Sequence, residues 1–206
     1  RPVTNPRGAS KEAAAAAAAY FVLKGEYADQ GAVLDPAYAA SLGAVPNGPA
    51  KTRGIAVGTE IANAWLAMRL NDGREASVPY TFVDPPQAGD YQRTPPANAN
   101  ALAPWLAVMQ PLAMSRFDQF RAYGPPDLTS VHYAQDVAMV QALGSANSTE
   151  RTAEETEISR VYTESPTTFF SHNLREFAAT KNLGVAGNAR LFAQVFVTAA
   201  DSMIAC

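Results

Sequence analysis

The chain has 206 residues, of which 48% are hydrophobic and 17% charged, and its formal net charge at pH 7 is −3. This length and composition are typical of one globular domain with its own core, and two small domains are the alternative. It lacks the basic footprint of a nucleic-acid-binding protein, and its longest apolar run, residues 13–23, is too short to span a bilayer. The one cysteine, Cys206, excludes an internal disulfide and a zinc site built from cysteines.

Hydrophobic spacing and helix-boundary residues predict an all-α fold, a helical bundle without a convincing strand. Ser10 is the expected N-cap of a first helix that contains seven consecutive alanines. Thr152 and Glu155 are spaced as a capping box, and Ser165 before Pro166 is a typical helix start. The expected helices cover residues 11–24, 35–42, 50–71, 127–143, 152–164, 167–181 and 184–206.

A long proline-rich connection separates the first three helices from the last four. Residues 72–130 hold nine of the fifteen prolines, so no regular helix runs through them. The same residues are rich in aromatic and aliphatic side chains, which disordered segments lack. We therefore predict an ordered connection that wraps the helices. The expected organisation is one domain, with first helices in 1–71, the wrap in 72–126 and a second helix group in 127–206.

Two glycines, Gly54 and Gly58, lie four residues apart in the helix that carries Trp65. Residues four apart share one helix face, and glycine lets a neighbouring main chain come close. We predict that this face is where the helix packs against another one.

Several short segments, in this order along the chain, resemble the vanadium-dependent haloperoxidase and PAP2-type acid phosphatase superfamily, in the N-terminal to middle portion of a bacterial member. The segments are residues 50–58 (AKTRGIAVG), 69–73 (RLNDG), 91–96 (YQRTPP), 119–130 (QFRAYGPPDLTS), 143–144 (LG), 151–158 (RTAEETEI), 189–193 (ARLFA) and 199–201 (AAD). The resemblance implies a helical-bundle protein that binds vanadate, or phosphate in the phosphatases. It also implies export, and with it a periplasmic or extracellular location.

The family's anion pocket uses a lysine seven residues before an Arg-Pro, a Ser-Gly-His, and an arginine six residues before a second histidine. Cations and a hydroxyl hold the oxyanion, and the last histidine bonds the metal or acts as nucleophile. None of these motifs occurs here, and we interpret the similarity of residues 1–4 to the Arg-Pro motif as coincidence. The resemblance places the motifs just after the segment that matches 199–206. We therefore expect the catalytic residues C-terminal to Cys206. The apolar stretch 196–206, which has no helix-stopping residue, also indicates a fragment cut inside a helix.

Two acids remain as candidate site residues in a supporting role. Glu164 lies within one residue of where the family places an acid beside an anion-binding arginine; the alternative is a surface acid at a helix end. Asp201 falls in an apolar stripe, and a buried carboxylate needs a partner. That partner is either a cation of the missing half or a nearby helix hydroxyl or water.

The other polar residues favour structural roles. His132 and His172 lie on separate expected helices without a second ligand nearby, so we predict no metal site. Arg151 and Arg190 are expected to bind backbone carbonyls and tie helices to the wrap.

The resemblance implies that the parent protein oxidises halide with peroxide, using vanadate as cofactor, and that this chain alone is inactive and holds no cofactor. A PAP2-type acid phosphatase is the alternative within the superfamily. An alternative from another class is a stand-alone helical interaction or structural protein. In either case the apolar last helix is expected to be covered, by the remaining half of the parent, which could also bind in trans, or by a second copy of the chain.

Overall fold

The computed structural model describes residues 6–205, so the predictions made for residues 1–4 and for Cys206 lie outside it. Within that range the chain is all-α, with seven α-helices, two 3-10 helices and no strand, as predicted. The α-helices are α1 (Lys11–Glu26), α2 (Gly31–Gly43), α3 (Pro49–Arg69), α4 (Val131–Leu143), α5 (Ala153–Tyr162), α6 (Pro166–Lys181) and α7 (Gly184–Ala205). The 3-10 helices are η1 (Ala28–Gln30) and η2 (Pro104–Val108).

Two of the expected helix starts are confirmed by hydrogen bonds. The Ser10 hydroxyl accepts the N–H of Ala13 at 3.1 Å at the start of α1. Thr152 and Glu155 form the complete capping box of α5. α4 begins at Val131, four residues later than predicted, because Asp127 folds a turn instead: its carboxylate accepts both the N–H and the hydroxyl of Thr129.

α1 and α3 pack with their main chains unusually close. A Cβ added to Gly54 would lie 2.5 Å from the carbonyl oxygen of Ser10, and one added to Gly58 would lie 2.3 Å from that of Ala14. Both glycines are buried, and Ala17 of α1 is fully buried beside Gly58. The alanine run of α1 therefore forms a smooth surface against which the glycine face of α3 rests, as the spacing of the glycines predicted.

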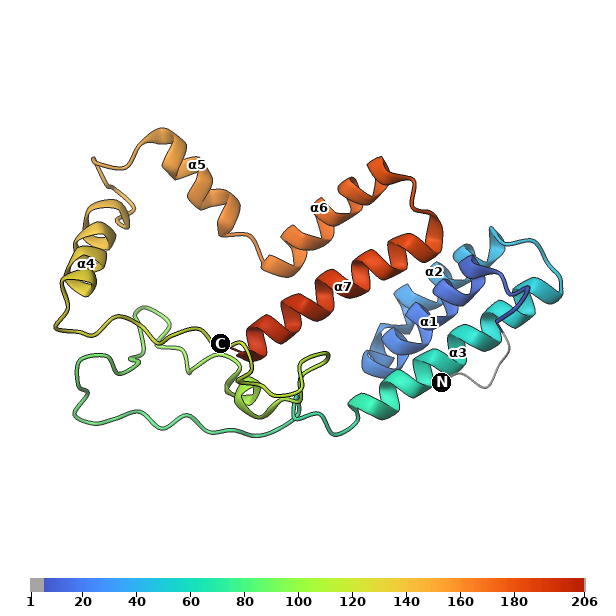
Figure 1. Ribbon diagram of the computed structural model, residues 1–206, viewed down its shortest axis with the longest axis horizontal. Helices are drawn as coiled ribbons and strands as arrows, with labels where there is room; N and C mark the ends of the chain where they lie inside the picture. The colour runs from blue at the N-terminus through green and yellow to red at the C-terminus, as the bar shows by residue number, and fades with distance from the viewer. Residues whose placement is uncertain (1–5, 206) are drawn as a thin grey trace.

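α2 packs against α1 through a polar and aromatic cluster. The rings of Tyr20 and Tyr38 stack with centroids 4.1 Å apart. The Asp35 carboxylate accepts the Tyr20 hydroxyl at 2.9 Å and the Lys24 ammonium at 2.8 Å. α2 starts four residues before its predicted beginning and keeps Pro36 inside the helix. Helices α1, α2 and α3 lie together at one end of the molecule in Figure 1.

The long non-helical connection between α3 and α4 is present. It carries its own aromatic cluster, in which the rings of Tyr80, Phe82 and Tyr91 contact one another and Arg93 lies over the Phe82 ring at 4.4 Å. Its 3-10 helix packs against α7. Figure 1 shows the connection passing the C-terminal end of α7 and then running to α4, away from α1 and α2. The connection thus wraps the end of α7 and leaves the outer faces of the first helices open.

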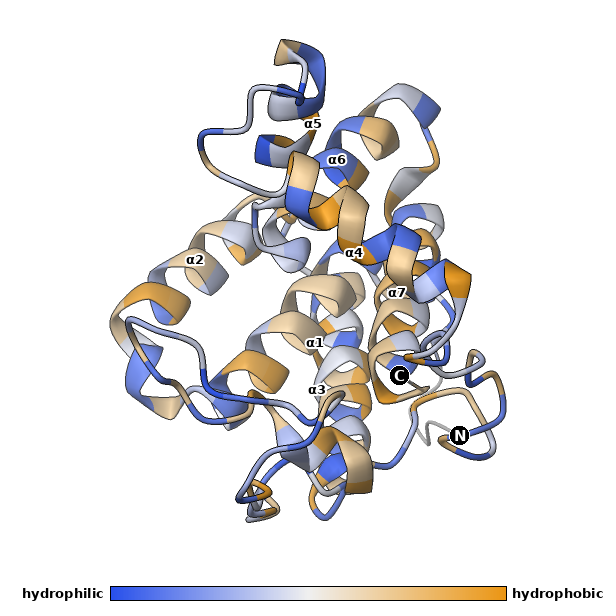
Figure 2. Ribbon diagram, turned by 90° about the vertical axis from the view of Figure 1, so that its left-hand side faces the viewer, coloured by the Kyte–Doolittle hydropathy of each residue, from blue (hydrophilic) through white to orange (hydrophobic). Residues whose placement is uncertain are grey.

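The second helix group is much more open than the first. α7 contacts α1, but α4, α5 and α6 pack extensively against no other element of residues 6–205. Large hydrophobic and aromatic side chains on these helices stay about half exposed or more, among them Val140, Ile158, Tyr162 and Phe177. Figure 2 shows hydrophobic residues, in orange, on the ribbons of α4, α5 and α6. The chain exposes 15214 Å² of surface. A compact folded monomer of 21.8 kDa would expose only about 9,300 Å².

The described part of the chain contains no helix with both the length and the apolar character needed to cross a membrane.

Candidate functional site

Asp201 projects from α7 onto three consecutive main-chain amides of the connection. Its carboxylate accepts the N–H groups of Leu112, Ala113 and Met114 at 2.6, 2.7 and 2.8 Å. Successive amides that point into one concavity form a nest suited to an anion, and here the anion is a side chain of the protein itself. The side chain is 4% exposed. This contact ties α7 to the connection.

The charge of Asp201 is stabilised in this buried place. Burial alone would raise the pKa of its carboxyl, but the three amide hydrogen bonds and the positive charge of Arg69 outweigh burial and hold the pKa below its ordinary value. Asp201 is therefore an ionised anchor at neutral pH.

Arg69 and Asp72 form a second buried pair at the end of α3. Arg69 Nε lies 2.7 Å from Asp72 Oδ2, and the side chains are 5% and 2% exposed. Asp72 Oδ2 accepts no hydrogen bond of acceptable geometry. Its contact with Arg69 is therefore an ion pair, stabilised by the opposite charges. Arg69 also donates to the carbonyls of Gln110 at 3.0 Å and Pro111 at 3.5 Å. The Asp72 carbonyl in turn accepts the N–H of Gln110 at 2.6 Å.

Two neighbours complete this junction. Arg74 pairs with Glu26 at the end of α1 at 2.7 Å, and its N–H donates to Asp72 at 3.0 Å. Gly73 has a φ of +94°, and a Cβ there would lie 2.5 Å from the Val108 carbonyl oxygen. The junction, defined as Arg69, Asp72, Asp201 and residues 110–114, thus joins the ends of α1 and α3, the last turns of α7 and the connection. Sequence reasoning found Asp201 but missed its partners.

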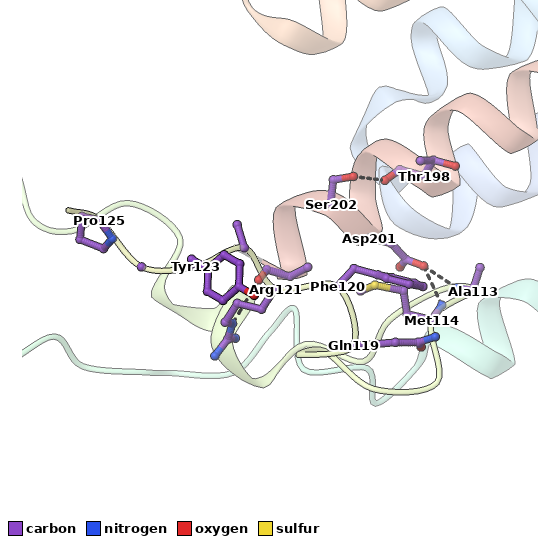
Figure 3. A pocket seen from close by; sticks show the side chains of 13 residues that line it. Ala113, Met114, Gln119, Phe120, Arg121, Tyr123, Pro125, Thr198, Asp201 and Ser202 are labelled. Atoms are coloured by element: carbon purple, nitrogen blue, oxygen red, sulfur yellow. Dashed lines mark hydrogen bonds between the residues drawn. The ribbon is translucent and has the colours of Figure 1, made fainter. Parts of the chain in front are cut away.

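An open groove of about 900 Å³ lies next to the junction, between residues 113–125 and the last turns of α7. Figure 3 shows Asp201 and Arg121 on its walls, with Phe120 and Tyr123 beside them. Arg121 donates through Nε to the carbonyl of Ala205 at 3.2 Å. Its positive charge therefore stabilises the C-terminal end of α7. The Phe120 side chain is 71% exposed.

This groove carries no recognisable catalytic set. Its carboxylate is held by amides, its one arginine binds a carbonyl, and no histidine lines it. Residues 6–205 contain no group of three or more histidine, cysteine or acidic side chains that could hold a metal ion. Vanadate needs several cations and a histidine around one oxyanion pocket. The groove does not fit it, because its arginine, Arg121, is engaged by a carbonyl and the groove presents an acid.

The other polar residues that the sequence singled out lie elsewhere. Glu164 is exposed in the turn between α5 and α6 and does not line the groove. His132 is exposed on α4, and His172 lies 3.2 Å from Glu176 one turn along α6. Arg151 binds the carbonyls of Leu143, the last residue of α4, and of Ser145 just after it, so it holds the end of this helix by carbonyls, although it does not tie the helix to the wrap.

Comparisons with known proteins found no matching family model, no similar curated protein and no similar solved structure.

Proposed function

We propose that this chain is the non-catalytic helical part of a vanadium-dependent haloperoxidase-like protein of the PAP2 superfamily, whose complete form oxidises halide with peroxide. The observation that supports this most is the junction. Residues 69–73 and 199–201, two of the segments that carry the family resemblance, lie far apart in the sequence yet meet around residues 110–114. In this proposal the junction fixes the scaffold on which the anion-binding half is built.

The large exposed surface supports the proposal that another polypeptide covers part of this chain. The chain exposes about 6,000 Å² more than a compact monomer of its mass, and an ordinary stable interface buries only about 800 Å² on each partner. An uncovered area of this size fits a large helical polypeptide better than a small docking contact. In the proposal, the remaining half of the parent protein covers α4 to α7.

The direct test is an activity measurement on the purified chain with vanadate, bromide and hydrogen peroxide. We expect no bromination of an organic acceptor, because the groove beside the junction is lined by one arginine, one carboxylate and no histidine. A known vanadium haloperoxidase in the same assay shows that the reagents work. Vanadate-dependent bromination by this chain alone would overturn the proposal.

The same assay on a longer natural protein that contains this sequence separates the alternatives. Bromination that requires vanadate supports the haloperoxidase function. Hydrolysis of p-nitrophenyl phosphate, inhibited by vanadate, would make the parent a PAP2-type acid phosphatase. If the longer protein does neither, the chain is a helical interaction or structural protein, an alternative favoured by the exposed hydrophobic side chains of α4, α5 and α6.

A further inference from the structure

The turn between α2 and α3 holds an Asn-Gly pair that is open on all sides. Asn47 and Gly48 are both exposed, and a Cβ added to Gly48 would meet nothing within 4 Å. The hydrogen bonds of the described residues include none donated by the Gly48 nitrogen. This nitrogen is therefore not held in a hydrogen bond, and residue 48 has no side chain that would shield it from the Asn47 side chain.

A lysine holds the amide that the nitrogen would attack. The Lys51 ammonium donates to the Asn47 side-chain oxygen at 3.0 Å, and also to the Val45 carbonyl at 3.2 Å. Lys51 takes part in no ion pair among residues 6–205, so no carboxylate neutralises its charge there. A fixed cation on a carbonyl oxygen polarises the carbon and stabilises the negative charge that develops on the oxygen during attack.

We propose that Asn47 is a self-modification site, at which the chain deamidates through a cyclic imide with Lys51 assisting. The main-chain nitrogen of Gly48 forms a bond to Asn47 Cγ and gives up its proton, while the bond from Cγ to the side-chain nitrogen breaks. That nitrogen leaves with the proton as ammonia. Water then opens the ring at either carbonyl, which yields aspartate or isoaspartate. One water is consumed and one ammonia released, and no oxidant or reductant takes part.

The modification acts on the start of α3. A new carboxylate at position 47 meets the Lys51 ammonium and lies just before the N-terminus of α3, where negative charge is favourable. The isoaspartate product instead lengthens the main chain directly before Gly48, whose carbonyl accepts the Thr52 N–H at 3.2 Å. The aspartate product therefore stabilises the first turn of α3, whereas the isoaspartate product destabilises it.

The chain contains its own reference sites. Asn100 also has a cation on its side-chain oxygen, since Arg93 donates to it at 2.6 Å, but Ala101 follows it and carries a Cβ. Asn147 is exposed and precedes Ser148, without a lysine at its amide. Comparison of the three asparagines separates the effect of glycine from that of the cation.

The test is peptide mapping by mass spectrometry after incubation of the purified full chain at mildly alkaline pH, with isoaspartate detected by enzymatic methylation. We expect Asn47 to convert about tenfold faster than Asn100 or Asn147. Lys51→Met should slow conversion about fivefold, the effect of one lost charge-assisted hydrogen bond at an exposed site, and Lys51→Arg should retain most of the rate. Circular dichroism checks that both variants fold.

Two results would overturn the proposal. Conversion of Asn47 no faster than that of Asn147 would show that the pair is not a privileged site. An unchanged or faster rate in Lys51→Met would show that Lys51 does not assist the attack, or that it restrains Asn47 against it.

Discussion

The α1–α3 pair and the α4–α6 group have hydrophobic residues in similar number but differ in how far these residues are buried. In the pair, glycines and alanines bring two main chains together, and the result is a small dense core around Gly54, Gly58 and Ala17. In α4 to α6, larger side chains such as Val140 and Phe177 remain 68% and 49% exposed. Burial within this chain therefore follows shape complementarity rather than side-chain hydrophobicity.

The largest expected effect comes from loosening the junction, which ties α7 and the connection to the ends of α1 and α3. Asp201→Asn removes the charge that three amides bind and places an NH₂ group among donors, so we expect about 3 kcal/mol of lost stability in urea unfolding. Limited proteolysis should also cut the connection faster. Asp118→Asn, which breaks only an exposed pair with Arg116, is the matched control and should change little. Equal effects of the two changes would contradict the anchoring role.

The close approach of α1 and α3 can be broken with a single methyl group. Gly58→Ala forces a Cβ to within 2.3 Å of the Ala14 carbonyl, so the helices must separate, and we expect about 2 kcal/mol of destabilisation. Gly43→Ala is the control, because nothing lies within 4 Å of its Cβ and alanine favours a helix. Thermal or urea unfolding of both variants measures the difference. A neutral Gly58→Ala would mean that the helices do not touch there.

The junction should also give the stability a pH dependence. The folded-state pKa of Asp201 lies below its unfolded value, so its stabilisation is present above about pH 3.9 and is lost as the pH falls through the folded pKa. Urea unfolding at a series of pH values should show the gap between wild type and Asp201→Asn shrinking in acid. A gap that stays constant with pH would mean that ionised Asp201 is not the anchor.

The smallest effect is expected in the open group. Ile158 is 50% exposed on α5, so Ile158→Ser should change the stability of the isolated chain by about 0.5 kcal/mol or less. Urea unfolding of the wild type and of Ile158→Ser measures this difference. A loss of about 2 kcal/mol would show that α5 packs against the rest of this chain.

Much of the fold could be predicted because its signals are local. Ser10 and the Thr152–Glu155 capping box fix helix starts through contacts within four residues, and the spacing of Gly54 and Gly58 marks a packing face. Asp127 misled the prediction because the same carboxylate caps a helix or folds a turn, and here the turn with Thr129 forms.

The candidate site was less accessible to sequence reasoning. Asp201 was found because a carboxylate in an apolar stripe needs a partner, but its partners are main-chain amides 87 to 89 residues away. A nest of main-chain amides has no characteristic side chain by which a sequence could reveal it. Arg69 and Asp72 were recognised only as part of a helix end. Their spacing of three residues at the C-terminal end of α3 was a usable signal for an ion pair.

Hydrogen exchange followed by mass spectrometry on the purified chain tests the division into a packed and an open region most directly. Helices of this length without extensive packing are marginal in water, so we expect rapid exchange in α4, α5 and α6. Exchange should be slow in α1 and α3 and at the amides of Leu112, Ala113 and Met114 that bind Asp201. Equal protection of all seven helices would contradict the account, because it would mean that the chain is complete in its packing without a partner.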